Sequence, residues 1–361
     1  MKKVLFITQS LSSGGAERRM VNIAIQLKQR GYQPSFLCLR EGDFYASQLH
    51  EHNIPIKWIT KRNLIYRLYL ALLYIRKGDY DVKVSFLDVP NIINCISSIG
   101  GKNGRAIIGE ASAAFEYQKL MGTVDVFKGI IIGYLTRFAE ILVCNSKHAA
   151  DLWKDKYPIY NSKIKFIYNP ILIPEVTSEY EPRKNGRTQI VVAASYQWIK
   201  NIINVIEAVR LMENRDLIEI NWYGREDTEY EKANKLIKQY SLCNIIHLNK
   251  ETKDIANRMH EADFVALFSK SEGLPNAICE GMGIGKPIIM TRVSDYHRLV
   301  DSNGFLCDSE HIGSIKNALS EAAQISPQKL REMGEISRRK ACILFAPDTI
   351  IHEWINLIEM V

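Results

Sequence analysis

Short apolar runs alternate along the chain with segments in which apolar residues recur every three or four positions. The first apolar run covers residues 4–7 and is followed by a glycine-containing turn. After the turn, the spacing i, i+3, i+4, i+7 places four apolar residues on one face of a helix: Met20, Ile23, Ala24 and Leu27. A strand, a turn and an amphipathic helix in this order are typical of a βαβ unit, so we predict a parallel sheet covered by helices.

The same alternation continues to residue 167, stops, and starts again at residue 190. In the first stretch we predict further strands at residues 35–39, 82–86, 106–108, 141–144 and 164–167. In the second stretch we predict strands at residues 190–194, 218–223, 245–248, 264–268 and 287–291, and helices at 202–212, 229–240, 252–261 and 276–283. A closing helical region follows the last of these strands.

Tyr168-Asn169-Pro170 and the segment after it, which is rich in Pro and Glu, mark the interruption. We therefore predict an α/β protein with two doubly wound domains, at residues 1–172 and 173–345. Residues 346–361 are expected to form a C-terminal helix that packs back on the first domain. Ligands of such sheets bind at the carboxyl ends of the strands, so the loops after strands and the cleft between the domains are the candidate site.

Composition narrows the class of protein. Apolar residues make up 47% and charged residues 24% of the 361 positions, which excludes disordered, collagen-like and disulfide-stapled chains. The seven cysteines are scattered without a CxxC pair, as expected for buried thiols in a reducing compartment. The first apolar run ends at Thr8, too soon for a signal peptide, and no uninterrupted apolar run approaches the roughly 18 residues of a membrane span. We expect a cytoplasmic protein.

The net charge of +7 is unevenly distributed. Residues 1–173 contain 24 Lys and Arg against 13 Asp and Glu, a balance of +11, whereas residues 174–361 contain 23 against 27, a balance of −4. This asymmetry predicts that the first half meets an anionic partner. Nucleic acid is disfavoured because no basic helix with interleaved base-reading or stacking residues is present.

Two segments of the basic half, residues 61–77 and 117–137, mix cations with Leu, Ile and Tyr. Such a segment can lie on an anionic bilayer with its apolar side at the acyl boundary. It can equally be an ordinary domain helix whose inner face is formed by Leu64, Leu68, Leu72 and Ile75. The sequence leaves both interpretations open.

The stretch Ser271-Glu272-Gly273-Leu274-Pro275-Asn276-Ala277-Ile278-Cys279-Glu280 is the most specific pattern in the chain. It places one carboxylate in the loop after a strand and a second one turn into the next helix. The backbone N–H groups of Gly273 and Leu274 lie at the helix start, where they can receive a phosphate. Gly14 and Gly15, between the first strand and helix, form a weaker pattern of the same kind. They do not make the GxGxxG fingerprint of nicotinamide enzymes.

Glu272 and Glu280, in the setting Ser-x-x-Glu-Gly-Leu-Pro-Asn followed by Gly285-Lys286-Pro287, resemble the signature of the retaining family 4 glycosyltransferases. The order of Gly-Gly-Ala-Glu-Arg near the start, Asn145-Ser146 and Asn303-Gly304 is also similar to that family. The resemblance covers nearly the whole chain. It implies the GT-B fold, in which two Rossmann-like domains face each other across a cleft.

The resemblance also implies roles for individual residues. Glu280 would hold the ribose hydroxyls of a nucleotide, and Glu272 would orient the transferred sugar and stabilise the transition state. The N–H groups of Gly273 and Leu274 would meet the sugar and the diphosphate. Lys200 matches the family's diphosphate-binding lysine, a cation that neutralises charge on the leaving group.

Two positions depart from the family pattern. The arginine expected five residues before Lys200 is Ser195 here, so its role passes to Arg18, to Arg225 or to no residue. We keep Ser195 and Arg225 among the donor-binding candidates. Ala111 stands where many members carry a histidine or arginine that faces the reaction centre. Glu110 and Ser112 are the candidate substitutes, Glu110 as a catalytic residue and Ser112 as an acceptor-binding one.

No metal or other cofactor is predicted. Asp79-Tyr80-Asp81 has the form of a DxD metal site, but it follows a helix and precedes a strand, so we interpret it as a helix-exit turn. Among the histidines only His50 and His52 are closely spaced, and their polar neighbours favour a solvent-facing position.

The sequence thus predicts a retaining transferase that moves a hexose or N-acetylhexosamine from a nucleotide diphosphate sugar, a UDP-sugar in our interpretation. The expected acceptor is a glycan on a lipid of the undecaprenyl-pyrophosphate type, at the inner face of the plasma membrane, for a bacterial surface polysaccharide or protein-linked glycan. The alternatives are a nucleotide-sugar epimerase or synthase of the same fold, or a catalytically weak sugar-nucleotide-binding protein, which Ala111 and Ser195 would favour.

Overall fold

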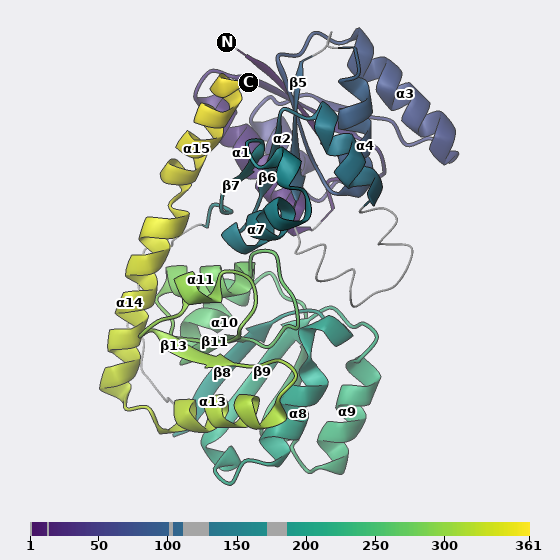
Figure 1. The fold of residues 1–361 in the computed structure, drawn as a ribbon. Coiled ribbons are helices and arrows are strands. Elements are labelled where there is room, and N and C mark those ends of the chain that lie inside the picture. The colour runs from purple at the N-terminus through teal and green to yellow at the C-terminus, as the bar shows by residue number, and fades with distance from the viewer. Residues whose placement is uncertain (1, 13, 101–103, 111–129, 172–185) are drawn as a thin grey trace. The chain divides into compact units, whose positions relative to one another are not determined.

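The computed structural model describes residues 2–12, 14–100, 104–110, 130–171 and 186–361 (Figure 1). The chain divides into two compact units. Unit 1 comprises Met1–Pro170 together with Pro347–Val361, and unit 2 comprises Ile171–Ala346. Each unit is built on one parallel sheet with helices on its faces.

The sheet of unit 1 has seven parallel strands in the order β3-β2-β1-β4-β5-β6-β7. Its strands are β1 (Lys3–Thr8), β2 (Gln33–Cys38), β3 (Ile56–Trp58), β4 (Val82–Phe86), β5 (Arg105–Glu110), β6 (Ile141–Cys144) and β7 (Ile164–Phe166). The helices are α1 (Gly15–Gln29), α2 (Ala46–Glu51), α3 (Leu64–Lys77), α4 (Asp88–Ser97) and α7 (Lys147–Lys156). Strand β1 is apolar and buried from Val4 to Ile7, as expected for a strand covered on both faces.

Helix α15 (Pro347–Met360) belongs to unit 1 although unit 2 precedes it in the chain. Lys2 Nζ donates a hydrogen bond to Ile358 O at 2.8 Å, and Arg30 forms an ion pair with Asp348 at 2.9 Å. Trp354 is fully buried, with its ring 6.0 Å from that of Phe86. These contacts hold the last helix on the first sheet.

One helical run in the described residues, Pro327–Met360, is long and apolar enough to cross a membrane by length and composition. A single run of this kind is weak evidence for a span, because core helices pass the same test. Five apolar side chains of α15 are buried within unit 1: Ile350, Ile351, Trp354, Leu357 and Ile358. We therefore assign this part of the run to packing.

The sheet of unit 2 has six parallel strands in the order β10-β9-β8-β11-β12-β13. They are β8 (Thr188–Ala193), β9 (Ile218–Gly224), β10 (Ile246–Lys250), β11 (Phe264–Leu267), β12 (Ile288–Thr291) and β13 (Gly304–Cys307). The helices are α8 (Ile202–Arg210), α9 (Tyr230–Gln239), α10 (Ile255–Glu261), α11 (Asn276–Ile284), α12 (Tyr296–Leu299), α13 (Ile312–Gln324) and α14 (Pro327–Phe345). The main core lies where Ile190 and Val192 of β8, with Trp222 of β9, meet the apolar faces of α8 and α13.

In both sheets the side on which the chain adds new strands switches next to the first strand. From β1 the chain builds β2 and β3 outward on one side and then β4 to β7 on the other, and from β8 it does the same with β9, β10 and then β11 to β13. The loops after β8 and β11 therefore diverge at a topological switch point, where doubly wound sheets bind ligands. The predicted fold class, two doubly wound parallel sheets, is confirmed.

The sequence prediction missed two strands. Strand β3 has three residues and β13 has four, each lies at an edge of its sheet, and their side chains are mostly half-buried. The apolar signal of such short edge strands is weak, so Ile56–Trp58 went unassigned and Gly304–Cys307 fell within the predicted closing helical region.

Candidate active site

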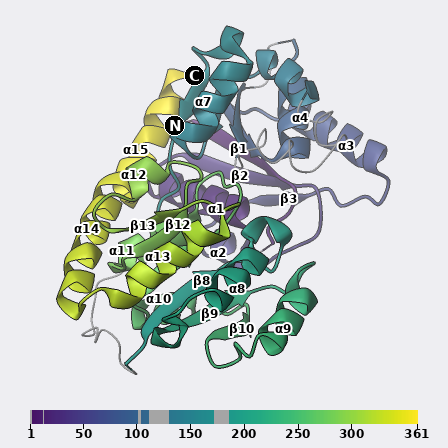
Figure 2. The same cartoon turned by 60° about the horizontal axis from the view of Figure 1, so that its bottom comes forward.

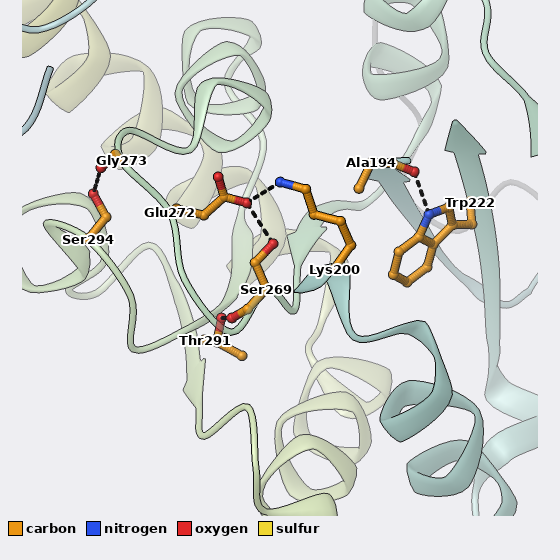
Figure 3. A network of polar contacts seen from close by, with 8 residues as sticks. All are labelled: Ala194, Lys200, Trp222, Ser269, Glu272, Gly273, Thr291 and Ser294. Carbon is orange, nitrogen blue, oxygen red and sulfur yellow. Dashed lines mark hydrogen bonds and ion pairs between the residues drawn. The ribbon is translucent and has the colours of Figure 1, made fainter. Parts of the chain in front are cut away.

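Lys200 and Glu272 meet at the switch point of unit 2. Lys200 follows β8, Glu272 follows β11, and Lys200 Nζ lies 2.5 Å from Glu272 Oε1 (Figure 3). The two side chains are 22% and 14% exposed, so the pair is largely shielded but still reachable from solvent. The structure thus brings together the two charged groups that the sequence placed in separate loops.

The loop after β8 is held by two aromatic residues. Tyr196 is fully buried, and its hydroxyl donates to the carbonyl oxygens of Trp222, at 2.9 Å, and Asn249, at 2.8 Å. Burial raises the pKa of Tyr196, so the hydroxyl stays a protonated donor. Trp222 Nε1 donates to Ala194 O at 2.7 Å (Figure 3). Both ends of this segment are therefore fixed to β9 and β10, with Ser195 between them.

Gly224 is required where β9 passes this loop. A Cβ atom at position 224 would lie 2.0 Å from Ala194 O and 3.0 Å from Ser195 Cα, both backbone atoms. One residue further on, Arg225 O accepts a hydrogen bond from Tyr196 N at 3.0 Å. The Arg225 side chain is 66% exposed and lies 3.7 Å from Asp227. Arg225 is therefore a neighbour of the Ser195 segment, and its role in place of the missing arginine stays a prediction.

Lys200 ends a 3-10 turn, Trp198–Lys200, that leads into α8. The next residue, Asn201, has φ 69°, and its side-chain amide donates to Ser309 O at 2.8 Å. Asparagine is one of the few residues that accept this left-handed backbone readily, and the amide contact fixes the turn. The ammonium of Lys200 is aimed across the switch point as a result.

The loop after β11 is held by hydroxyl groups. Ser269 Oγ donates to Glu272 Oε1 at 2.6 Å, and Thr291 Oγ1, at the end of β12, donates to Ser269 O at 2.6 Å (Figure 3). Ser294 Oγ donates to Gly273 O. The carboxylate is thus positioned by its own loop, and the loop is tied to the neighbouring strand.

A backbone hydrogen bond joins the two loops directly. Lys270 N donates to Ile199 O at 2.9 Å, which brings the residue before Lys200 next to the Glu272 loop. The Lys270 side chain turns away from the carboxylate, toward Glu310 at 2.7 Å and the Trp198 ring. Lys200 and Lys270 are therefore neighbouring cations with different partners.

The Lys200 and Glu272 pair keeps bonding capacity for a ligand. Within the described part of the chain, Glu272 Oε2 has no hydrogen-bond partner, because both contacts of the carboxylate fall on Oε1. Lys200 has three N–H donors, and one of them is used, by Glu272. A ligand with an anionic group and hydroxyl groups could therefore bind both residues without first breaking their contact.

Glu280 lies one turn into α11, which begins at Asn276 directly after the Glu272 loop. Its side chain is partly exposed, whereas Gly273 and Leu274 are buried just before the helix. Gly281 keeps α11 close to β11, since a Cβ there would lie 2.7 Å from the Val265 side chain. The tight packing fixes the position of Glu280 at the same edge of the sheet as Glu272.

The remaining sequence candidates lie in unit 1. Gly14 caps α1 and Gly15 begins it. The Glu17 carboxylate folds back over this helix start, where a Cβ on Gly14 would lie 2.0 Å from Glu17 Oε2, and burial raises the pKa of Glu17. An anion arriving at this helix start would therefore meet a carboxylate first.

Glu110 is the last residue of β5 and is half-buried, and its carbonyl accepts from Asn145 N at 3.2 Å. Ala111 and Ser112 lie outside the described residues. Arg18 is exposed on α1. Glu110 and the two glycines thus share the carboxyl edge of the first sheet, at β5 and β1.

The DxD-like pair does not lie at a carboxyl edge. Asp81 accepts from Lys3 N at 2.7 Å, and Asp79 accepts from Lys3 Nζ at 2.6 Å. These carboxylates therefore hold the start of β1, at the opposite edge of the sheet from the ligand-binding loops. Across the described ranges, no three His, Cys, Asp or Glu side chains are grouped as a metal site would need.

Two protein-family models match the chain. The model for Glycosyltransferase Family 4 matches residues 13–172, and the model for Glycosyl transferases group 1 matches residues 187–324. The chain belongs to the family 4 glycosyltransferases. Its activity class is therefore that of a transferase, as the resemblance of the Glu272 region predicted.

This glycosyltransferase is 23% identical to an uncharacterized glycosyltransferase of Haemophilus influenzae, over 98% of this chain and 99% of that one. It is 34% identical to the O-antigen biosynthesis glycosyltransferase WbnH of Escherichia coli, over 22% of this chain and 23% of that one. The crystal structure of Anabaena HepE in complex with UDP and glucose matches all of both chains, with a TM-score of 0.84 and 17% identity. The likeness confirms the predicted GT-B fold.

The sequence did not assign roles to the residues that hold the site of this glycosyltransferase. They are Tyr196, Trp222, Ser269, Thr291 and Ser294. Only Ser269 had a usable signal, since it is the serine of the Ser-x-x-Glu spacing before Glu272. The others come from different strands and loops, and their contacts depend on how the sheet brings those strands together.

Proposed function

We propose that the protein is a retaining glycosyltransferase that uses a UDP-hexose or UDP-N-acetylhexosamine and carries out the transfer at Lys200 and Glu272. The observation that carries this proposal is the pairing of the two side chains at the switch point of unit 2, 2.5 Å apart, with donor and acceptor capacity left on each. HepE, solved with UDP and glucose, has the same fold and supports a uridine nucleotide.

In the proposed complex the diphosphate lies against Lys200 and the N–H groups of Gly273 and Leu274 at the start of α11. The negative charge of the leaving diphosphate grows as the bond to the sugar breaks. A preplaced ammonium and helix N-terminus stabilise that charge without reorganising, which is the electrostatic contribution a metal makes in other transferases. Glu280 accepts from the ribose hydroxyls.

The transfer breaks the bond between the anomeric carbon and the diphosphate oxygen and forms one from the acceptor oxygen on the same face. The acceptor proton passes to the departing diphosphate oxygen, so the products are the glycoside and UDP. Glu272, held through Oε1 by Ser269 and Lys200, directs Oε2 to the sugar and stabilises positive charge at the anomeric carbon. No metal takes part in this proposal.

We further propose a lipid-linked glycan acceptor of the undecaprenyl-pyrophosphate type, reached at the inner face of the plasma membrane. Residues 1–173 carry the net charge of +11, whereas Lys200, Glu272 and Glu280 lie in the half with −4. The positive charge therefore belongs to the half without Lys200, Glu272 and Glu280 and suits a pyrophosphate or an anionic membrane. The name of the Escherichia coli relative, an O-antigen biosynthesis enzyme, is consistent with this acceptor class.

The test is a panel of nucleotide sugars, first by thermal shift and then by turnover with a lipid-linked acceptor. A ligand that binds the folded state raises the melting temperature, so the panel identifies the donor. NMR of the product then gives the anomeric configuration, and retention is expected. Inversion would overturn the proposed mechanism. Unchanged donor turnover in Glu272→Ala with UDP still bound would remove Glu272 from it.

A further inference from the structure

Helix α3 exposes a group of large apolar side chains. Leu64 is 49%, Ile65 79%, Tyr66 51% and Tyr69 56% exposed, and all four lie in its first six residues. No other helix among the described residues exposes as many large apolar side chains. Figures 1 and 2 both show α3 at the outer margin of unit 1. Exposed apolar side chains gathered in this way mark a surface that is covered by something else.

The rest of α3 is an ordinary packed helix. Ala71 and Ile75 are fully buried in the core of unit 1, and Leu68 and Leu72 pack partly against it. The inner face expected from the sequence therefore packs in the C-terminal half of the helix, whereas Leu64, which was expected on that face, is exposed. The packed C-terminal half anchors α3, and the apolar residues of the first turns of α3 are exposed to solvent.

The exposed half is already folded as a helix. Asn63 caps α3, and its Oδ1 accepts from Tyr66 N at 3.0 Å. A good N-cap stabilises the first turn without help from the core. The apolar surface therefore exists before any partner binds, and docking needs little ordering of the chain.

The charges within α3 and in the three residues before it are of one sign. Residues 61–77 contain five Lys and Arg and no Asp or Glu. Lys61 and Arg62, just before the helix, are exposed. Apolar side chains, tyrosines and cations together suit the boundary of an anionic bilayer, where rings sit at the headgroups and cations meet the phosphates.

We propose that the start of α3 docks the protein on an anionic lipid bilayer. We define the α3 surface as Lys61, Arg62, Leu64, Ile65, Tyr66 and Tyr69. Their apolar side chains enter the headgroup region while Lys61 and Arg62 pair with lipid phosphates. Docking of this kind would bring the enzyme to a lipid-linked acceptor, so its biological purpose rests on the proposed function. The geometry and its test need neither donor nor acceptor.

The test is cosedimentation of the full-length protein with vesicles of mixed phosphatidylglycerol and phosphatidylcholine, and with phosphatidylcholine alone. We expect binding to the anionic vesicles that weakens as salt is raised. Lys61→Glu with Arg62→Glu should lower the partition coefficient roughly tenfold or more, given two cations near the surface. Ile65→Glu with Tyr69→Glu should lower it at least as much, because charge replaces the inserted side chains.

Ile159→Glu is the matched control. Ile159 is 84% exposed in unit 1 and lies in a short turn away from α3 in sequence, Pro158–Tyr160. We expect this variant to bind vesicles as the unchanged protein does. Thermal unfolding should be the same for all the variants, since none of the substituted side chains is buried.

Three results would overturn the α3 proposal: no binding of the unchanged protein to anionic vesicles, equal loss in Ile159→Glu, or α3 variants that bind normally. If sedimentation shows a dimer that Ile65→Glu dissociates while vesicle binding is absent, the surface instead joins two copies of the chain. Turnover of the donor with a lipid-linked acceptor in detergent micelles, without vesicles, is measured alongside. If that turnover is absent while vesicles still bind, the proposed function has failed and the docking surface stands.

Discussion

Lys200 Nζ and Glu272 Oε1 lie 2.5 Å apart, and this contact joins the loops that follow the two strands on either side of the switch point. Each partner is mostly shielded from water. Removal of one therefore leaves the other as a poorly solvated charge, which is more harmful than loss of an exposed ion pair. The site depends on both loops being placed correctly before a ligand arrives.

Ser269→Ala should lower kcat more than it changes KM. The substitution removes the 2.6 Å hydrogen bond to Glu272 Oε1 and frees the carboxylate to rotate, while Lys200 stays in place. A hydrogen bond to a charged group contributes about 1.5–3 kcal/mol, so we expect a loss of roughly tenfold to a hundredfold in kcat. Steady-state kinetics measure it, with the exposed Ser302→Ala as control. Equal kcat in the two variants would contradict a positioning role for Ser269.

Gly224→Ala should destabilise unit 2 and displace the Ser195 segment. The added Cβ would collide with the backbone at Ala194 and Ser195, which have no flexible end to move aside. We expect a loss of at least about 2 kcal/mol in the free energy of unfolding, measured by urea titration. Gly186→Ala is the comparison, because Gly186 has φ +73° but open space around it. It should lose only about 1 kcal/mol, from backbone strain. Equal losses would refute a steric role for Gly224.

Lys286 should make stability depend on pH. It is 2% exposed, and burial lowers its pKa to about 7 from 10.5. Between these values the folded protein holds the lysine mostly neutral while the unfolded chain keeps the proton. The unfolded state binds more protons, so stability should rise with pH across this window.

The measurement is urea unfolding at pH 7.5 and 9 of the unchanged protein and Lys286→Met. One linked proton changes the free energy of unfolding by about 1.4 kcal/mol per pH unit. Between these pH values the free energy of unfolding should therefore rise by ~2 kcal/mol more in the unchanged protein than in the variant. Lys250→Met replaces an exposed lysine and is the control, so its free energy of unfolding should rise with pH as much as that of the unchanged protein. A Lys286→Met variant with the same pH slope as the unchanged protein would show that this lysine is not the linked group.

Much of the fold could be predicted because its central strands are continuously apolar. The predicted bounds of β4 and β6 coincide with the observed ones, and the strands before Lys200 and Glu272 were placed within two residues of their observed ends. Once β8 and β11 are central strands of a parallel sheet, the loops that follow them must lie at one edge. The location of the site therefore follows from the strands.

The support of the site could not be predicted in the same way. Trp222 reaches Ala194, and Thr291 reaches Ser269, only because the strand order sets β9 and β12 on opposite sides of β8 and β11. Helix α3 shows a second limit. The spacing of Leu64 with Leu68 predicts a common inner face, but the helix extends beyond the core that covers Ala71 and Ile75. The apolar periodicity of a sequence predicts which face of a helix is buried, but it does not predict at which residue the packing against the core ends.

The most direct test of the Lys200 and Glu272 site is calorimetric titration of UDP into the unchanged protein, Lys200→Ala and Lys270→Ala. Lys270 is the matched control, because it lies in the adjoining loop but pairs with Glu310. We predict that Lys200→Ala weakens UDP binding about tenfold to a hundredfold, the range for a hydrogen bond to a charged group, and that Lys270→Ala changes it less than threefold. Equal affinities in Lys200→Ala and the unchanged protein would contradict the account.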